Sequence, residues 1–61
     1  MYSKGDMVKF RYDEKVITGK ITVVDSFDIV GDNNKISYDI FSEENNCLYK
    51  HINEFDILEK C

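Results

Sequence analysis

The chain of 61 residues has few of the features that mark the larger protein classes: no Pro, no Trp, three Gly, two Cys and one His. No apolar run approaches the about 20 residues that span a bilayer, so we expect no transmembrane helix. The first residues lack the apolar segment of a signal peptide. Two Cys are too few for a disulfide scaffold. Together these absences favour a soluble, reduced, cytoplasmic domain.

The charge is unevenly distributed along the chain. Residues 1–25 carry five basic and four acidic side chains, whereas residues 26–61 carry three basic and eight acidic ones, and the net charge is −4. Nucleic-acid binders usually carry a basic surface, because neutralised phosphates supply most of their affinity. An acidic chain is therefore a poor nucleic-acid binder unless its basic first half forms one face. The net charge keeps a small domain soluble, and an acidic surface attracts a basic partner.

Apolar residues alternate with polar ones at a period of two through most of the chain, which is typical of half-buried β-strands. A short apolar piece covers residues 27–30, and the strongest turn signal follows at 31–34. Residues 51–55 are too few for a stable α-helix and suit one 3₁₀ turn. The expected strands are residues 7–12, 16–24, 36–41, 47–50 and 56–58.

The alternation assigns side chains to the two faces of these strands. In the first strand, Val8 and Phe10 share a face with Tyr12. In the second, Gly19 lies on the apolar face, where a glycine indicates a bulge, a bend or the close approach of another backbone. The other residues expected on the apolar faces of the second and third strands are Ile17, Ile21, Val23, Ile36, Tyr38 and Ile40.

Five short strands, one internal glycine and a single turn before the last strand describe a small, curled antiparallel sheet. An open sheet of this kind leaves two edges that invite aggregation, and closure into a small barrel removes both. We therefore expect one all-β domain over residues 1–61, a five-stranded antiparallel barrel with one 3₁₀ turn before the last strand. Such a barrel leaves no segment for a catalytic loop or a second domain.

Motifs along nearly the whole chain resemble those of a known class of barrel. They are Gly-Asp-x-Val-x-Phe at 5–10, Thr-Gly-Lys-Ile at 18–21, Tyr-Asp-Ile at 38–40 and Leu-Tyr-Lys-His-Ile at 48–52. This order resembles SH3-like barrels of the KOW and Tudor kind, which implies that residues 53–56 form the 3₁₀ turn. The Trp and Pro of the ordinary SH3 peptide-binding signature are absent. The chain also resembles small uncharacterised proteins of Gram-positive bacteria and their phages, a likeness that implies no activity.

The hairpin between the third and fourth strands decides which side chains of the fourth strand are buried. A turn with two central residues would place Tyr49 and His51 on the inner face. A three-residue loop with Asn45 in the left-handed region would instead place Leu48 and Ile52 inside. We prefer the second register because it buries more aliphatic area. The residues that it leaves on the outer face are Phe41, Cys47, Tyr49 and His51.

Residues that could catalyse a reaction or bind a metal are few. Cys47 precedes His51 by four residues, but a domain of this size has little room for the substrate cleft that a Cys–His–Asp site needs. A structural zinc site uses four ligands, usually paired as CxxC, and the soft ligands here are only Cys47, His51 and Cys61. The three glycines are too far apart for a phosphate-binding loop. We therefore expect no enzymatic activity, no metal and no other cofactor.

The remaining function is binding, and one group of residues suits a protein partner. Aromatic side chains next to Lys and His are what protein interfaces favour. The group predicted to bind a partner is Tyr12, Phe41, Tyr49, Lys50 and His51. The resemblance to SH3-like barrels implies a ligand groove near the 3₁₀ turn. The alternative for Tyr49 and Phe41 is that they pack in the core.

Two other functions stay open. A nucleic-acid-binding module would use the basic first hairpin, with Tyr12 or Tyr49 stacking on a base. The basic residues expected on one outer face of that hairpin are Lys9, Arg11, Lys20 and Lys15. A small-molecule-binding protein would have to be an oligomer, because a barrel this small builds pockets only between subunits. We favour a non-enzymatic protein-binding module, such as a phage or mobile-element protein that occupies the surface of a basic host protein.

Overall fold

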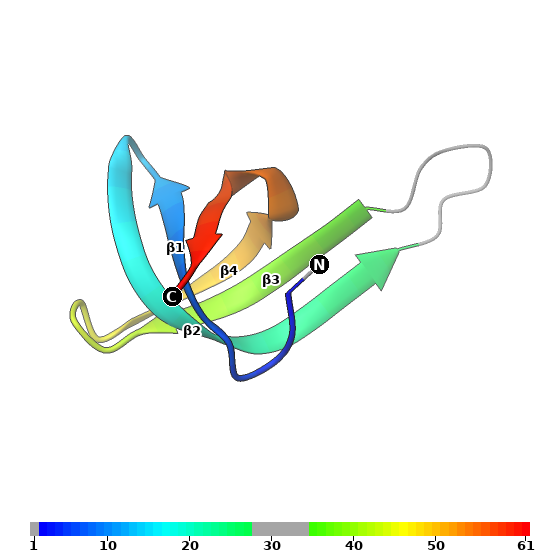
Figure 1. Ribbon diagram of the computed structural model, residues 1–61, viewed down its shortest axis with the longest axis horizontal. Helices are drawn as coiled ribbons and strands as arrows, with labels where there is room; N and C mark the ends of the chain where they lie inside the picture. The colour runs from blue at the N-terminus through cyan, green and yellow to red at the C-terminus, as the bar shows by residue number, and fades with distance from the viewer. Residues whose placement is uncertain (1, 28–34) are drawn as a thin grey trace.

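The computed structural model describes residues 2–27 and 35–61 and confirms an all-β fold with five antiparallel strands and a 3₁₀ helix before the last one (Figure 1). The elements are β1 (Met7–Tyr12), β2 (Lys15–Phe27), β3 (Lys35–Ser42), β4 (Cys47–Asn53), η1 (Glu54–Asp56) and β5 (Ile57–Lys60). The predicted apolar piece at 27–30 lies outside the described residues beyond its first position, and the predicted turn at 31–34 lies wholly outside them. Across the described ranges, no helix has the length and apolar character needed to cross a membrane.

The strands form one sheet in the order β4-β3-β2-β1-β5. β2 bends along its 13 residues, so the sheet curls round its inner face (Figure 1). β4 and β5 are the two edges, and no backbone ladder joins them in the part of the chain that the structure describes. The expected barrel is therefore not closed by hydrogen bonds. The last strand has only four residues and its ladder is with β1, while η1 connects the two edge strands.

The β1–β2 hairpin keeps one register over all six residues of β1. Its turn residues Asp13 and Glu14 both have positive φ, 49° and 65°, which matches the right-handed twist of the flanking strands. Because the register does not shift, the predicted alternation holds here. Val8 and Phe10 are fully buried, and Ile17 of β2 is buried beside them.

β2 contains one extra residue opposite β3. Ile21 pairs with Ile40, and the next pair is Val23 with Asp39. Thr22 therefore has no opposite residue, and its hydroxyl donates to the Asp39 carbonyl at 3.1 Å. A bulge of this kind exchanges the two faces of a strand. The prediction that Val23 lies inside is wrong for this reason: its side chain is 43% exposed, and the following valine packs against the core instead.

β4 contains a second bulge, at positions 50 and 51. Tyr49 pairs with Ile40, whereas Ile52 pairs with Tyr38, so two residues of β4 lie opposite one residue of β3. The chain accommodates the extra residue at His51, whose backbone φ of 58° lies in the left-handed region. Tyr49 packs against the core because it lies opposite the buried Ile40, and the bulge beyond it turns Ile52 inward, so that Ile52 is buried as predicted.

The preferred three-residue loop between β3 and β4 is wrong. Four residues separate the paired Ser42 and Cys47, and the left-handed residue is Asn46, with a φ of 50°, rather than Asn45. This loop places Leu48 on the outer face, where it is 42% exposed. The preference for aliphatic burial failed because the bulge after Tyr49 buries Ile52 without requiring Leu48 to turn inward.

The core occupies the inner face of the curled sheet. Gly19 lies in it where β3 crosses closely: a Cβ there would meet Ile40 Cγ2 at 2.6 Å and the Phe41 carbonyl oxygen at 2.8 Å. Of the three explanations open for Gly19, a bulge, a bend or the close approach of another backbone, the close approach is thus confirmed. The buried apolar residues are Val8, Phe10, Ile17, Ile21, Tyr38, Ile40, Ile52 and Ile57.

The hydroxyl of Tyr38 connects three distant segments. It accepts a hydrogen bond from the Tyr2 backbone N–H at 3.1 Å and donates to Glu54 Oε1 at 3.5 Å. The Tyr2 ring packs edge-on against the Tyr38 ring, with centroids 6.0 Å apart. Burial raises the pKa of Tyr38. One buried phenol therefore ties the N-terminal segment and η1 to β3.

Candidate functional site

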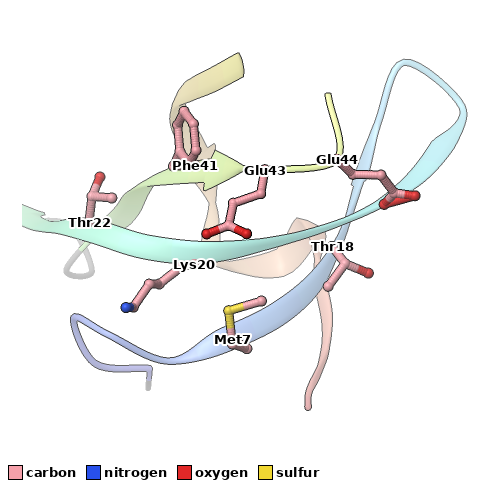
Figure 2. A pocket seen from close by; sticks show the side chains of 7 residues that line it. All are labelled: Met7, Thr18, Lys20, Thr22, Phe41, Glu43 and Glu44. Carbon is pink, nitrogen blue, oxygen red and sulfur yellow. The ribbon is translucent and has the colours of Figure 1, made fainter. Parts of the chain in front are cut away.

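The outer face of the sheet, opposite the core, carries a hollow of about 410 Å³ (Figure 2). Its residues come from β1, β2, β3 and the loop after β3. This hollow, hereafter the outer hollow, is lined by Met7, Thr18, Lys20, Thr22, Phe41, Glu43 and Glu44. A single chain thus supplies it, contrary to the expectation that a domain this small builds pockets only between subunits.

The floor of the outer hollow belongs to a row of side chains that crosses four strands in register. Met7 pairs with Lys20, Lys20 pairs with Phe41, and Phe41 pairs with Leu48 of β4. Directly opposite residues have Cβ atoms about 5 Å apart, so the row is continuous. Met7 is 43% exposed and Phe41 is partly buried. The row therefore exposes apolar surface with one cation in its middle.

No ion pair between described residues includes a charged group of the outer hollow. Among the residues that the structure describes, the ion pairs are Lys9–Glu59 at 3.6 Å and Lys60–Asp6 at 3.5 Å. Neither involves Lys20 or the two glutamates of the loop. Figure 2 shows the Lys20 ammonium and the Glu44 carboxylate extending toward opposite ends of the outer hollow. A ligand would thus meet an apolar floor, one positive group and an acidic rim.

The residues predicted to bind a partner do not form one patch. Tyr12 and Tyr49 do meet, with ring centroids 4.8 Å apart, and the Tyr49 ring also packs on Phe10 at 5.3 Å. Phe41 lies on the opposite face, in the outer hollow. Lys50 and His51 are exposed at the β4 bulge. The prediction that Tyr49 faces outward is wrong, because its place opposite Ile40 turns it toward the core.

The basic residues of the first hairpin fall as expected on one outer face, except Lys15. Lys9 and Arg11 alternate with the buried residues of β1, and Lys20 lies diagonally across from Lys9 on β2. Lys15 pairs with Tyr12 and so belongs to the other face. Glu59 of β5 neutralises Lys9, and the acidic rim borders the same face. The basic surface is therefore interrupted by carboxylates.

Two features of the outer surface were not found from the sequence. Phe55 of η1 is 91% exposed, and its backbone N–H is held by the Asn53 side chain at 2.8 Å. Asp25, Asp39 and His51 each offer a donor atom, and these atoms all lie within 4.8 Å of one another. Their sequence separations of 14 and 12 residues match no metal-binding motif, so only the strand register could have revealed them.

Comparison with known proteins gives no relative: the chain matches no protein-family model, no curated protein and no solved structure. The resemblance to SH3-like barrels therefore rests on the motifs in the sequence alone. The site must be interpreted from its own geometry.

Proposed function

We propose that this protein is a non-enzymatic protein-binding module and that its ligand site is the outer hollow. The observation that carries this proposal is an apolar floor, made by the exposed Met7 and the half-buried Phe41, inside a concave surface. Concave sites with an apolar floor and a few polar groups are typical of ligand recognition. An SH3-like barrel, which the strand order and η1 support, would then bind through the outer face of β1–β3 rather than through the predicted aromatic group.

The charges indicate the kind of partner. Glu43 and Glu44 are exposed at the rim, and the net charge of the chain is −4. A partner segment with an apolar side chain on the floor and a Lys or Arg beside it would complement both features. Lys20 would pair with a carbonyl or carboxylate of the same segment. We therefore propose a basic, extended protein segment as the ligand.

Nucleic-acid binding by Lys9, Arg11 and Lys20 has less support. The ion pair between Lys9 and Glu59 removes one of these cations, and the glutamates at the rim would repel phosphates nearby. This alternative serves as a second outcome of the binding test. It predicts affinity for an oligonucleotide that falls steeply with salt.

The test uses short synthetic peptides with one central Leu or Phe flanked by Lys and Arg, and the same peptides flanked by Asp and Glu. Binding is followed by NMR chemical shifts of the full chain. We expect the basic peptides to bind, with shifts centred on Met7, Lys20 and Phe41. We expect Phe41→Ala to weaken binding by about tenfold or more. The matched control is Phe55→Ala, because Phe55 is exposed but lies outside the outer hollow.

Charge reversal separates the apolar and ionic contributions. Glu43→Lys together with Glu44→Lys should weaken the basic peptides and shift preference toward the acidic ones. Binding of neither peptide set, or shifts confined to Tyr12 and Tyr49, would overturn the proposal. An oligonucleotide that binds at about 50 mM salt, and is released by more salt, would favour the alternative instead.

A further inference from the structure

The geometry points to a second site, independent of the proposed peptide site: we propose that Asp25, Asp39 and His51 bind one divalent transition-metal ion such as Zn²⁺. The three residues lie on three neighbouring strands, β2, β3 and β4. One donor atom from each lies within 4.8 Å of the other two. The set combines two carboxylate oxygens with one imidazole nitrogen, all of which are ligands of Zn²⁺ in proteins.

The two bulges bring these side chains together. Asp39 pairs with Val23, beside the Thr22 bulge, and Asp25 lies two residues further along β2. On the other side of β3, the β4 bulge places His51 next to Asp39, whose Oδ1 accepts the His51 backbone N–H at 3.2 Å. Bulges often re-aim side chains beside functional sites. A regular ladder would have turned His51 toward the core, opposite Tyr38.

The spacing and charge of the cluster suit a cation. Zinc bonds to nitrogen and oxygen are about 2.0–2.2 Å long, so two ligands of one ion lie at most about 4.4 Å apart. Small side-chain rotations would close the observed spacing. Asp25 and Asp39 are both half-buried, and no ion pair among the described residues includes either carboxylate. A divalent ion would neutralise their mutual repulsion.

The donor set also selects the metal. Ca²⁺ and Mg²⁺ prefer sites made wholly of oxygen ligands, whereas an imidazole favours Zn²⁺, Co²⁺ or Ni²⁺. Three protein ligands leave at least one coordination position open, because zinc takes four. His51 is exposed, so that position would be open to water or to a ligand atom. Phe41 of the outer hollow is two residues from Asp39 on the same face of β3.

The test exploits the single His of the chain. Zn²⁺ is titrated into the full, tag-free protein while the imidazole resonances of His51 are followed by NMR. We expect saturation at one ion per chain. Asp39→Asn and Asp25→Asn should each weaken Zn²⁺ binding by about tenfold or more. Even the loss of a group that only hydrogen-bonds to a metal ligand costs about tenfold. Asp39→Asn keeps an oxygen acceptor for the His51 N–H, and Asp56→Asn, an exposed residue outside the cluster, is the matched control.

His51→Gly should abolish binding while the fold persists, because glycine accepts the left-handed backbone at this position. Three results would overturn the proposal. The His51 resonances could fail to move with Zn²⁺; both Asp→Asn variants could bind as tightly as the original chain, which would mean an isolated imidazole; or Ca²⁺ could bind more tightly than Zn²⁺. Zinc bound only at the exposed thiols of Cys47 and Cys61 would leave His51 unshifted and so belongs to the first result.

Discussion

The β1–β2 hairpin and the β3–β4 hairpin are built from similar alternating residues, yet their registers differ. β1 pairs with β2 along its whole length without a shift, whereas β4 gains one residue opposite β3 at positions 50 and 51. In the first hairpin, alternation alone decides which side chains are buried. In the second, the four-residue loop turns Tyr49 inward and leaves Leu48 outside, and one extra residue then turns Ile52 inward and places His51 beside Asp39. A single bulge can therefore divide one strand between the core and the outer face of the sheet.

The largest expected effect separates the two aliphatic residues of β4. Ile52 is 4% exposed, whereas Leu48 is 42% exposed. We expect Ile52→Ala to lower the free energy of unfolding by about 3 kcal/mol, because it removes buried methyl groups and leaves a cavity. Leu48→Ala should cost less than about 1 kcal/mol. Urea unfolding of both variants measures the difference. Equal losses of stability would mean that Ile52 is no more buried than Leu48 and that the bulge does not turn Ile52 inward.

The next effect is at Gly19, where the regular hairpin meets β3. We expect Gly19→Ala to destabilise the fold by about 1–3 kcal/mol, because its Cβ would press on Ile40 and on the Phe41 carbonyl, and the latter is backbone and cannot rotate away. Thr18→Ala, the neighbouring residue on the outer face, is the control and should change stability little. A neutral Gly19→Ala would show that β2 and β3 are not held this closely.

A smaller effect is expected from the hydroxyl of Tyr38, on the β3 side. Tyr38→Phe leaves the Tyr2 N–H without its acceptor and should cost about 1 kcal/mol in urea unfolding. The pKa of Tyr38 is raised above its ordinary 10.0, mainly by burial. The folded chain therefore keeps a proton that the unfolded chain loses, and stability should fall as pH rises above about 10. Tyr38→Phe should reduce this fall in stability at high pH. If the substitution left the alkaline limb of the stability curve unchanged, the result would contradict the burial of the Tyr38 phenol.

The smallest effect is expected at Asp6, where the chain enters the regular hairpin. A hydrogen bond from the Ser3 N–H, helped by Lys60, lowers the pKa of Asp6 below its usual 3.8. Its contribution to stability is therefore present above about pH 3.8 and is lost as pH falls through the lower folded value. We expect Asp6→Asn to flatten the acid limb of the stability curve slightly. A steeper limb in the variant would show that the carboxylate is not stabilised by folding.

The sequence predicted the fold class, the strand count, the 3₁₀ turn and the burial of the regular hairpin, because each follows from the period of apolar residues. The errors at Val23, Leu48 and Tyr49 share one cause. Alternation fixes faces only relative to a neighbour, and an extra residue or a longer loop inverts that relation. The cluster of Asp25, Asp39 and His51 was missed for the same reason, since its members meet only through the shifted ladders.

The outer hollow was missed because it depends on a row that crosses four strands. Met7, Lys20 and Phe41 are far apart in sequence, and their alignment requires the register of three neighbouring strands. Phe41 was identified as a binding residue, but with aromatic companions that lie on the opposite face. Its binding role stays a prediction from residue type, whereas its neighbours follow from the strand pairing.

The most direct test of the central claim, that the β4 bulge divides this strand between the core and the outer face, is a map of cross-strand NOEs between β3 and β4. The shifted ladder predicts backbone contacts between Tyr38 and Ile52, together with contacts between Ile40 and Tyr49. Contacts between Tyr38 and His51 would indicate one unbroken register. That result would turn His51 inward, expose Ile52 and contradict the account.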